Sequence, residues 1–307
     1  MEYKIKVPVL FLIFNRPDET GQVFSRIKRA QPKTLYIAAD GPRDGKNGEK
    51  EVCEKTREIV SKIDWDCEVK TLYRETNLGC KIAVSSAITW FFENEEMGII
   101  LEDDCLPSDS FFRFCEELLI LYKNDSRIWH IDGSTFQKLK FETGYEFSKY
   151  CLIWGWATWR RAWNNYDPDI KNFPEFEKKN IMKSVWYKPE VRKLWLEKFK
   201  EVYNAQVDTW DFQWFYTVWI NNGMSIRPGV NLIKNIGFNA NATHVLSINK
   251  LLTEMKNEEI LFPLQHPEFF IPNMQLDDEC SVRRFGIRRP IKGFAFRLIN
   301  KIKKIMS

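Results

Sequence analysis

The chain has 307 residues, of which 44% are hydrophobic and 29% charged, a composition that predicts a soluble globular protein and excludes low-complexity and fibrous classes. Its seven cysteines lack CxxC and Cys/His ligand spacing, which argues against a disulfide framework and a zinc site and indicates reduced thiols. The net charge of +4 hides an asymmetry: nine Lys/Arg and no acid follow from Arg283 onward, leaving 37 bases against 42 acids before it.

The first third of the chain alternates apolar and amphipathic stretches. Apolar runs of this length, separated by helical periodicity and short connections, predict parallel strands joined by right-handed helical crossovers. We therefore expect an α/β fold with a Rossmann-like, mostly parallel central sheet flanked by helices. The expected strands are Val7–Phe14, Thr34–Ala39, Cys67–Tyr73 and Gly98–Leu101, and the expected helices run from about 18 to 30, 51 to 63 and 80 to 92.

Polar side chains follow each of these predicted strands. Asn15 and Arg16 come after the first, Asp40 after the second, and Arg74 and Asn77 after the third, while the fourth ends in three consecutive acids, 102–104. The carboxyl ends of parallel strands lie along one edge of a sheet, where open α/β sheets bind ligands. Three adjacent carboxylates suit a hard cation such as Mn²⁺ or Mg²⁺ shared with a diphosphate, although a solvated acidic turn is the plainer alternative.

Other nucleotide-binding classes do not fit the first strand. No GxGxxG follows it, as a dinucleotide-binding fold would require, and the chain has no GxxxxGK[ST] of a P-loop. The glycine-rich, Arg/Lys-bearing loop of sugar-nucleotide pyrophosphorylases is also missing after this strand.

The second half predicts a more helical region rich in tryptophan. We expect a strand at Ile128–Asp132, a tryptophan-rich segment entering a helix that runs to about Trp163, and a long helical region from Lys183 to Gln206 broken at Pro189. A further helix is expected to open at Asp208 and run to about Ile220.

These motifs, in this order over roughly residues 7–245, resemble those of GT-A glycosyltransferases. The chain is similar to bacterial members of the group related to the eukaryotic N-acetylglucosaminyltransferase that initiates complex N-glycans. The matching pieces are Asn15-Arg16-Pro17, Asp40-Gly41, Asn77-Leu78-Gly79, Leu101-Glu102-Asp103-Asp104, Trp154-Gly155-Trp156, Trp210-Asp211, Arg227-Pro228, Gly237 and His244.

The resemblance implies how a nucleotide sugar would be held. Asp104 would ligate Mn²⁺ (or Mg²⁺) bound to the nucleotide diphosphate. Asp103 would face the ribose, and Glu102 the base or the donor sugar. Asp40 would accept hydrogen bonds from the nucleobase, unless it only stabilises its turn, and Arg16, next to Asn15, would contact base or phosphate. Four further donor-side residues are implied, Asn15, Lys81, Trp156 and His244, although Lys81 fits an exposed first helical turn better and a lone histidine is more often structural.

Inverting transfer needs a base that takes a proton from the acceptor hydroxyl. In the resembling family this base is an acid in the segment matched by Trp210-Asp211, so we expect Asp211, with Asp208 as the second candidate. A purely structural alternative also fits, because Asp208 could cap a helix whose first turn holds Asp211.

The basic C-terminal segment predicts a different partner. Residues 290–306 form a basic amphipathic helix on a helical wheel, which suits the interface of an anionic membrane, although a helix packed on the body or a disordered tail would also fit. No signal-peptide h-region and no run of 18 apolar residues occurs, so we expect a cytoplasmic, peripheral membrane protein. The body has no Lys/Arg stripe for nucleic acid, which we do not expect as a partner.

The sequence thus predicts a catalytic domain over 1–245 and an extension over 246–307. The nucleotide-sugar half would run to about 132 and the acceptor half over 133–245. The expected activity is metal-dependent, inverting transfer from a nucleotide-diphosphate sugar, with a UDP-sugar expected, to a bacterial surface glycan or lipid-linked saccharide. A non-catalytic nucleotide- or glycan-binding protein and a retaining transferase are the alternatives.

Overall fold

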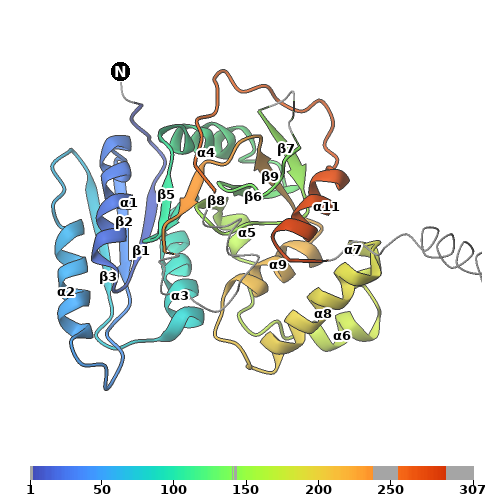
Figure 1. The fold of residues 1–307 in the computed structure, drawn as a ribbon, viewed down its shortest axis with the longest axis horizontal. Coiled ribbons are helices and arrows are strands. Elements are labelled where there is room, and N and C mark those ends of the chain that lie inside the picture. The colour runs from blue at the N-terminus through green and yellow to red at the C-terminus, as the bar shows by residue number, and fades with distance from the viewer. Residues whose placement is uncertain (1–2, 140, 142–143, 238–254, 288–307) are drawn as a thin grey trace, which may run out of the picture.

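The computed structural model describes residues 3–139, 141, 144–237 and 255–287 (Figure 1). His244 and the predicted helix at 290–306 lie outside these residues. Within them, eight strands form one central sheet in the order β3-β2-β1-β4-β8-β6-β9-β7. Its strands are β1 (Val9–Ile13), β2 (Thr34–Ala39), β3 (Glu68–Tyr73), β4 (Met97–Glu102), β6 (Ile128–Asp132), β7 (Tyr145–Ser148), β8 (Trp156–Trp159) and β9 (Met224–Pro228).

The sheet is mostly parallel, which confirms the predicted fold class. β1 pairs in parallel with β2 and with β4, and β2 pairs in parallel with β3. β1 is buried along its whole length, because every residue of its apolar run faces a helical layer. The antiparallel pairings are those of β8 with β4 and β6, and of β7 with β9.

The strand order reverses between β1 and β4, and this reversal sets where the helices lie. The chain moves outward from β1 through α1 (Pro17–Ala30) and α2 (Glu49–Val60), then returns through α3 (Gly79–Asn94) to β4. Right-handed crossovers put α1 and α2 on one face and α3 on the other, as the ribbon shows (Figure 1). The carboxyl ends of β1 and β4 therefore flank the crevice where open α/β sheets bind ligands.

A helical layer covers the other half of the sheet. Pro189 begins α8 because proline is well tolerated in a first helical turn, so the predicted break is a helix start. The segment expected to enter a helix at the tryptophan cluster instead forms β8, and only the four residues after it are helical. The helices of this half are α4 (Asp109–Leu121), α5 (Arg160–Trp163), α6 (Phe173–Lys178), α7 (Met182–Val185), α8 (Pro189–Tyr203) and α9 (Asp211–Ile220).

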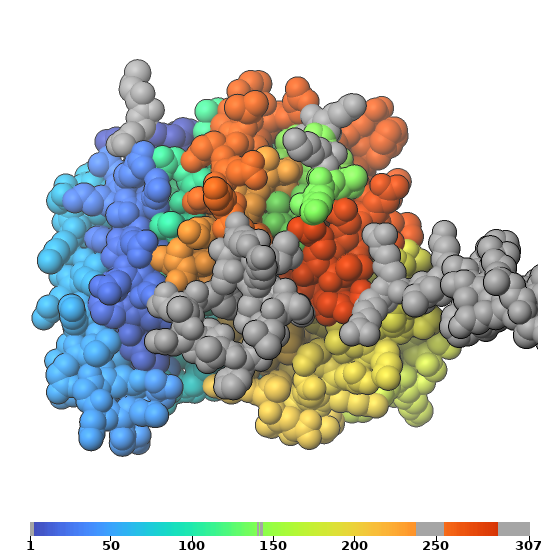
Figure 2. All heavy atoms as spheres, in the orientation of Figure 1, coloured from blue at the N-terminus to red at the C-terminus, as the bar shows by residue number. Residues whose placement is uncertain are grey.

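The last helix, α11 (Met274–Arg283), packs back onto the body. Asp278 pairs with Lys188 at 2.5 Å and accepts a hydrogen bond from Tyr187 at 3.0 Å, so α11 lies against the start of α8, as the space-filling view shows (Figure 2). The predicted division of the chain near residue 245 stays a prediction. Residues 255–287 nevertheless add Ile260, Leu264 and Cys280 to the common core.

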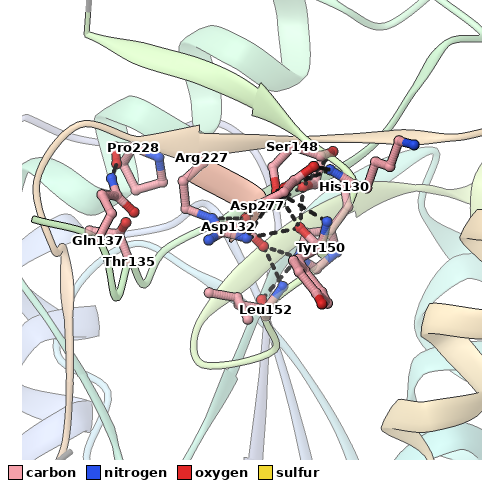
Figure 3. A network of polar contacts seen from close by, with 12 residues as sticks. His130, Asp132, Thr135, Gln137, Ser148, Tyr150, Leu152, Arg227, Pro228 and Asp277 are labelled. Carbon is pink, nitrogen blue, oxygen red and sulfur yellow. Dashed lines mark hydrogen bonds and ion pairs between the residues drawn. The ribbon is translucent and has the colours of Figure 1, made fainter. Parts of the chain in front are cut away.

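A buried polar network ties α11 to β6, β7 and β9 (Figure 3). Arg227 donates to the carboxylate of Asp132, and both side chains are fully buried. Asp277 accepts a hydrogen bond from Ser148 at 2.6 Å, and the Arg227 guanidinium donates to the Tyr150 carbonyl at 2.9 Å. Because buried charges need partners, this network fixes the register of the elements that carry it.

Within the described residues, no helix is long and apolar enough to cross a bilayer.

Candidate functional site

A cavity of about 420 Å³ opens at the reversal point between β1 and β4, and we call it the switch-point cavity. The ends of β1, β2 and β4 and the start of α3 form its walls. It brings together eight of the polar residues singled out in the sequence, whereas Asp104, the expected metal ligand, lies outside its lining; the eight are Asn15, Arg16, Asp40, Arg74, Asn77, Glu102, Asp103 and Asp208. The expectation that the strand-end polar residues meet at one edge of the sheet is therefore correct.

Arg16 lies across the acidic triplet. Its Nη1 donates to Asp104 Oδ2 at 2.6 Å and to Asp103 Oδ1 at 3.3 Å. Asp103 also accepts a hydrogen bond from the backbone N–H of Phe14 at 3.1 Å, which ties the end of β4 to the end of β1. In this state the Arg16 guanidinium is the cation that balances two of the three acids.

Glu102 has no such partner. Its Oε1 is buried and, among the described residues, accepts no hydrogen bond. Burial, followed by the charges of Asp104, Asp103 and Asp211, raises the pKa of Glu102 well above its usual range. Burial likewise raises the pKa of Asp103 to about 7, against the lowering effect of Arg16. Three acids share one arginine, so their full ionisation would leave an excess of negative charge that needs a further cation.

This excess fits a hard divalent cation. Carboxylate oxygens are preferred ligands of Mn²⁺ and Mg²⁺, and the partnerless oxygen of Glu102 shows that the acids are not saturated by the protein. No cluster of three His, Cys, Asp or Glu side chains that could hold a metal ion occurs among the residues described. Phosphate oxygens and water would therefore have to complete a coordination shell that begins at Asp104.

Arg16 competes for the same carboxylate oxygen that a cation at Asp104 would use. We therefore expect Arg16→Met to strengthen Mn²⁺ binding in the absence of nucleotide by roughly three- to tenfold, the scale of a partly exposed ion pair. Electron paramagnetic resonance of Mn²⁺ titrated into the protein measures this affinity. Arg26→Met, which removes an exposed pair with Asp109, is the matched control. Unchanged or weaker Mn²⁺ binding by Arg16→Met would contradict the competition.

Asp40 lines the cavity and also stabilises the turn that follows β2. Its Oδ1 accepts from the backbone N–H of Gly41 at 2.9 Å and of Leu78 at 3.0 Å, and its Oδ2 accepts from Asn77 Nδ2 at 2.9 Å. These bonds join the end of β2 to the loop before α3. Asn15 is similarly engaged, donating to Glu49 Oε1 at 3.0 Å.

Asp208 caps α3, a helix remote in sequence, rather than α9. Its Oδ2 accepts from the backbone N–H of Cys80 and its Oδ1 from that of Lys81, each at 2.8 Å. Both oxygens satisfy N–H groups in the first turn of α3, where negative charge is favourable. Position 79 requires glycine for two reasons: the φ of this residue is +77°, and an added Cβ would lie 2.7 Å from Asp208 Oδ2.

One donor-side prediction needs correction. Trp156 does not line the cavity: its ring is fully buried, stacked on His130 at 4.9 Å and on Trp210 at 5.6 Å. β8 is a central strand, so a tryptophan at its start packs in the core. Lys81 lies in the first turn of α3, as its structural alternative expects, and its ammonium pairs with Asp169 at 2.8 Å outside the cavity lining.

Asp211 lines a second cavity of about 270 Å³, which we call the aromatic cavity, and its charge contributes to the raised pKa of Glu102 in the switch-point cavity. The Thr209 hydroxyl donates to Asp211 Oδ1. Burial raises the pKa of Asp211, against the lowering effect of this hydrogen bond. The residues that line the aromatic cavity are Ser134, Phe136, Leu152, Ile153, Trp154, Leu194, Trp195, Lys198, Asp211, Phe212, Phe215, Arg284 and Phe285.

The residues that the sequence did not reveal belong mainly to this second cavity. Ser134, Lys198 and Arg284 come from three separate elements, and no spacing or motif connects them. Arg43 in the switch-point cavity was also missed, although it follows a predicted strand and could have been found by that position.

No protein-family model and no curated protein matches the chain. Among solved structures, a cytidylyltransferase from Leptospira borgpetersenii serovar Hardjo-bovis is 17% identical, covering 64% of this chain and 74% of its own at a TM-score of 0.35. A 4-diphosphocytidyl-2C-methyl-D-erythritolsynthase from Anaerococcus prevotii is 9% identical, with 57% and 84% covered and a TM-score of 0.34. A UDP-glucose pyrophosphorylase complexed with UDP-glucose is 10% identical, with 55% and 83% covered and a TM-score of 0.31. Likenesses this low carry no inference about activity.

Proposed function

We propose that the chain is a metal-dependent, inverting glycosyltransferase that takes a sugar from a nucleotide-diphosphate sugar, with a UDP-sugar expected. The acceptor would be a bacterial surface glycan or a lipid-linked saccharide at the inner face of the membrane. One observation carries the proposal: the ends of β1 and β4 converge on one cavity that Glu102 and Asp103 line, and Arg16 bonds to Asp103 and to the adjacent Asp104.

The switch-point cavity would hold the donor. Arg16 is the cation already placed over the acids and would turn to the diphosphate when that group enters. Asp40 would present acceptor oxygens to the nucleobase. Mn²⁺, bound through Asp104, would supply a Lewis acid that stabilises the charge of the leaving diphosphate.

Asp211 would act as the base. Its carboxylate takes the proton of an acceptor hydroxyl while the hydroxyl oxygen forms a bond to the anomeric carbon of the donor sugar. The bond from that carbon to the diphosphate oxygen breaks, and the diphosphate leaves with the electron pair. Attack opposite the leaving group inverts the anomeric configuration, so proton NMR of the product separates this reaction from a retaining one.

Nucleotide binding is the first test. In titration calorimetry with UDP, GDP and CMP, we expect one diphosphate nucleotide to bind only with Mn²⁺ present, and Asp104→Ala to weaken it by about 10- to 100-fold, the usual scale of lost metal-site contacts. Asp44→Ala, which removes an exposed loop carboxylate, is the matched control.

Two outcomes would overturn the donor site. Either no nucleotide binds under any condition, or binding ignores both Mn²⁺ and Asp104→Ala. Nucleotide binding by wild-type protein without sugar transfer to any acceptor would instead favour a non-catalytic binding protein.

A further inference from the structure

The aromatic cavity contains an arginine in unusual surroundings. Arg284 follows the last turn of α11 and lies over three rings, with its guanidinium carbon 5.3 Å from the centre of Trp154, 5.5 Å from Phe285 and 5.6 Å from Phe136. Burial lowers its pKa. Within the part of the chain that the structure describes, no carboxylate forms an ion pair with it. A cation enclosed by rings in this way is ready to receive an anion.

The other cation of the cavity differs. Lys198 pairs with Glu201 at 2.9 Å and is half-exposed, so its charge is already balanced. The acid that lines the cavity, Asp211, accepts a hydrogen bond from the Thr209 hydroxyl, and its charge favours the charged form of Arg284 although the two side chains form no ion pair. Of the cations that line this cavity, Arg284 is therefore the one without an ion-pair partner among the described residues.

A buried hydroxyl of the cavity also lacks a hydrogen-bond partner among the residues that the structure describes. The Ser134 side chain is fully buried, and its Oγ has no hydrogen-bond partner among the described residues. A buried hydroxyl that lines a cavity without a bond is costly, and a ligand hydroxyl would satisfy it. Aromatic walls, a free hydroxyl, a carboxylate and a guanidinium together suit a saccharide that carries an acidic group.

The position of Arg284 is fixed by the docking of α11. Glu279 accepts from the backbone N–H groups of Lys138 at 2.8 Å and Leu139 at 3.2 Å, and Arg283 donates to the carbonyl of Phe136. Both contacts reach the loop that follows β6, on which Ser134 and Phe136 lie. The guanidinium and the hydroxyl are thus held by one rigid assembly.

We propose that the aromatic cavity is the acceptor subsite and that Arg284 selects an acceptor carrying an anionic group, a carboxylate or a phosphate, close to the hydroxyl that reacts. This inference rests on the proposed transferase function, because it assigns Asp211 to the proton of that hydroxyl. It adds that the acceptor is acidic and that α11, far from the donor-binding strands in sequence, determines acceptor specificity.

Binding of acceptor-like probes tests the inference without the donor. Methyl β-D-glucuronide, glucose 6-phosphate and methyl β-D-glucoside are titrated into the full chain and followed by ligand-observed NMR. We expect at least one anionic probe to bind about tenfold or more tightly than the neutral glucoside, the scale of a charged hydrogen bond. The glucuronide and the phosphate distinguish the two sources of charge.

Variants then test whether Arg284 causes the preference for anionic probes. Arg284→Gln should bring the anionic and neutral probes to within about twofold of each other, while Arg284→Lys keeps part of the preference. Lys193→Gln, which removes an exposed cation of α8, should leave it intact. Equal binding of all probes by wild type, or a preference that survives Arg284→Gln, would overturn the inference. Titration of UDP with Mn²⁺ on the same samples reports the donor site separately, so the two proposals can fail independently.

Discussion

Replacing Asp211 with asparagine should lower the turnover of the transferase by about 10²- to 10⁴-fold, the usual contribution of a general base. The amide keeps the size of the side chain and an oxygen for the Thr209 hydroxyl, so the fold should persist. It cannot take a proton, however, and the acceptor hydroxyl then attacks unassisted. Initial rates of nucleotide release with the acceptor present measure the loss, and nucleotide affinity should change little.

Asp208→Asn is the matched control for this prediction. Its two carboxylate oxygens cap α3 at the N–H groups of Cys80 and Lys81, and asparagine keeps one of these acceptors in a cap of similar overall strength. Turnover should therefore stay within about tenfold of wild type, in contrast to the larger loss that removal of a general base produces. If the two variants lose activity equally, or Asp208→Asn loses more, the base is not Asp211.

Asp211 should also determine how activity falls at acid pH. Burial raises the pKa of Asp211 above its ordinary value of 3.8. Below that raised pKa the carboxyl holds a proton and cannot accept another, so activity should fall as the pH drops through it and be present above it. The residual activity of Asp211→Asn should lack this acid limb.

The lining of the switch-point cavity could be predicted from sequence because topology places it. Alternation of apolar runs and amphipathic helices requires parallel strands, and parallel strands bring Asn15, Asp40 and the triplet at 102–104 to one edge of the sheet. Neither step needs a side-chain contact. The pairing of Arg16 with Asp103 and Asp104 follows once β1 and β4 are neighbours.

The lining of the aromatic cavity could not be predicted in this way. Arg284 reaches its cavity only because α11 returns to the loop after β6, and that docking depends on long-range polar bonds that leave no periodic trace in the sequence. The misassignment of Trp156 has a related cause. A tryptophan-rich segment has the same sequence pattern whether its rings bind a sugar or pack in a core. Trp156 is in the core because β8 lies between β4 and β6, antiparallel to both.

Asp132→Ala should destabilise the protein by about 3–5 kcal/mol, because it leaves the buried Arg227 without its carboxylate partner. The Asp132 carboxylate also accepts from the backbone N–H of Leu152 at 2.5 Å, and both charged side chains are fully buried. Water cannot replace the lost oxygen atoms at such a depth. Urea unfolding followed by tryptophan fluorescence measures the change in the free energy of unfolding.

We expect the loss of unfolding free energy to depend on the burial of the Asp132–Arg227 pair rather than on its charge. Asp64→Ala removes a pair of similar length, Lys28 to Asp64 at 2.5 Å, from the surface, and should cost less than about 1 kcal/mol. Replacing both partners, as in Asp132→Leu with Arg227→Met, removes the isolated charge and should cost less than Asp132→Ala alone. A loss for Asp132→Ala no greater than that for Asp64→Ala would mean that the network of Figure 3 does not hold β6, β7 and β9 together.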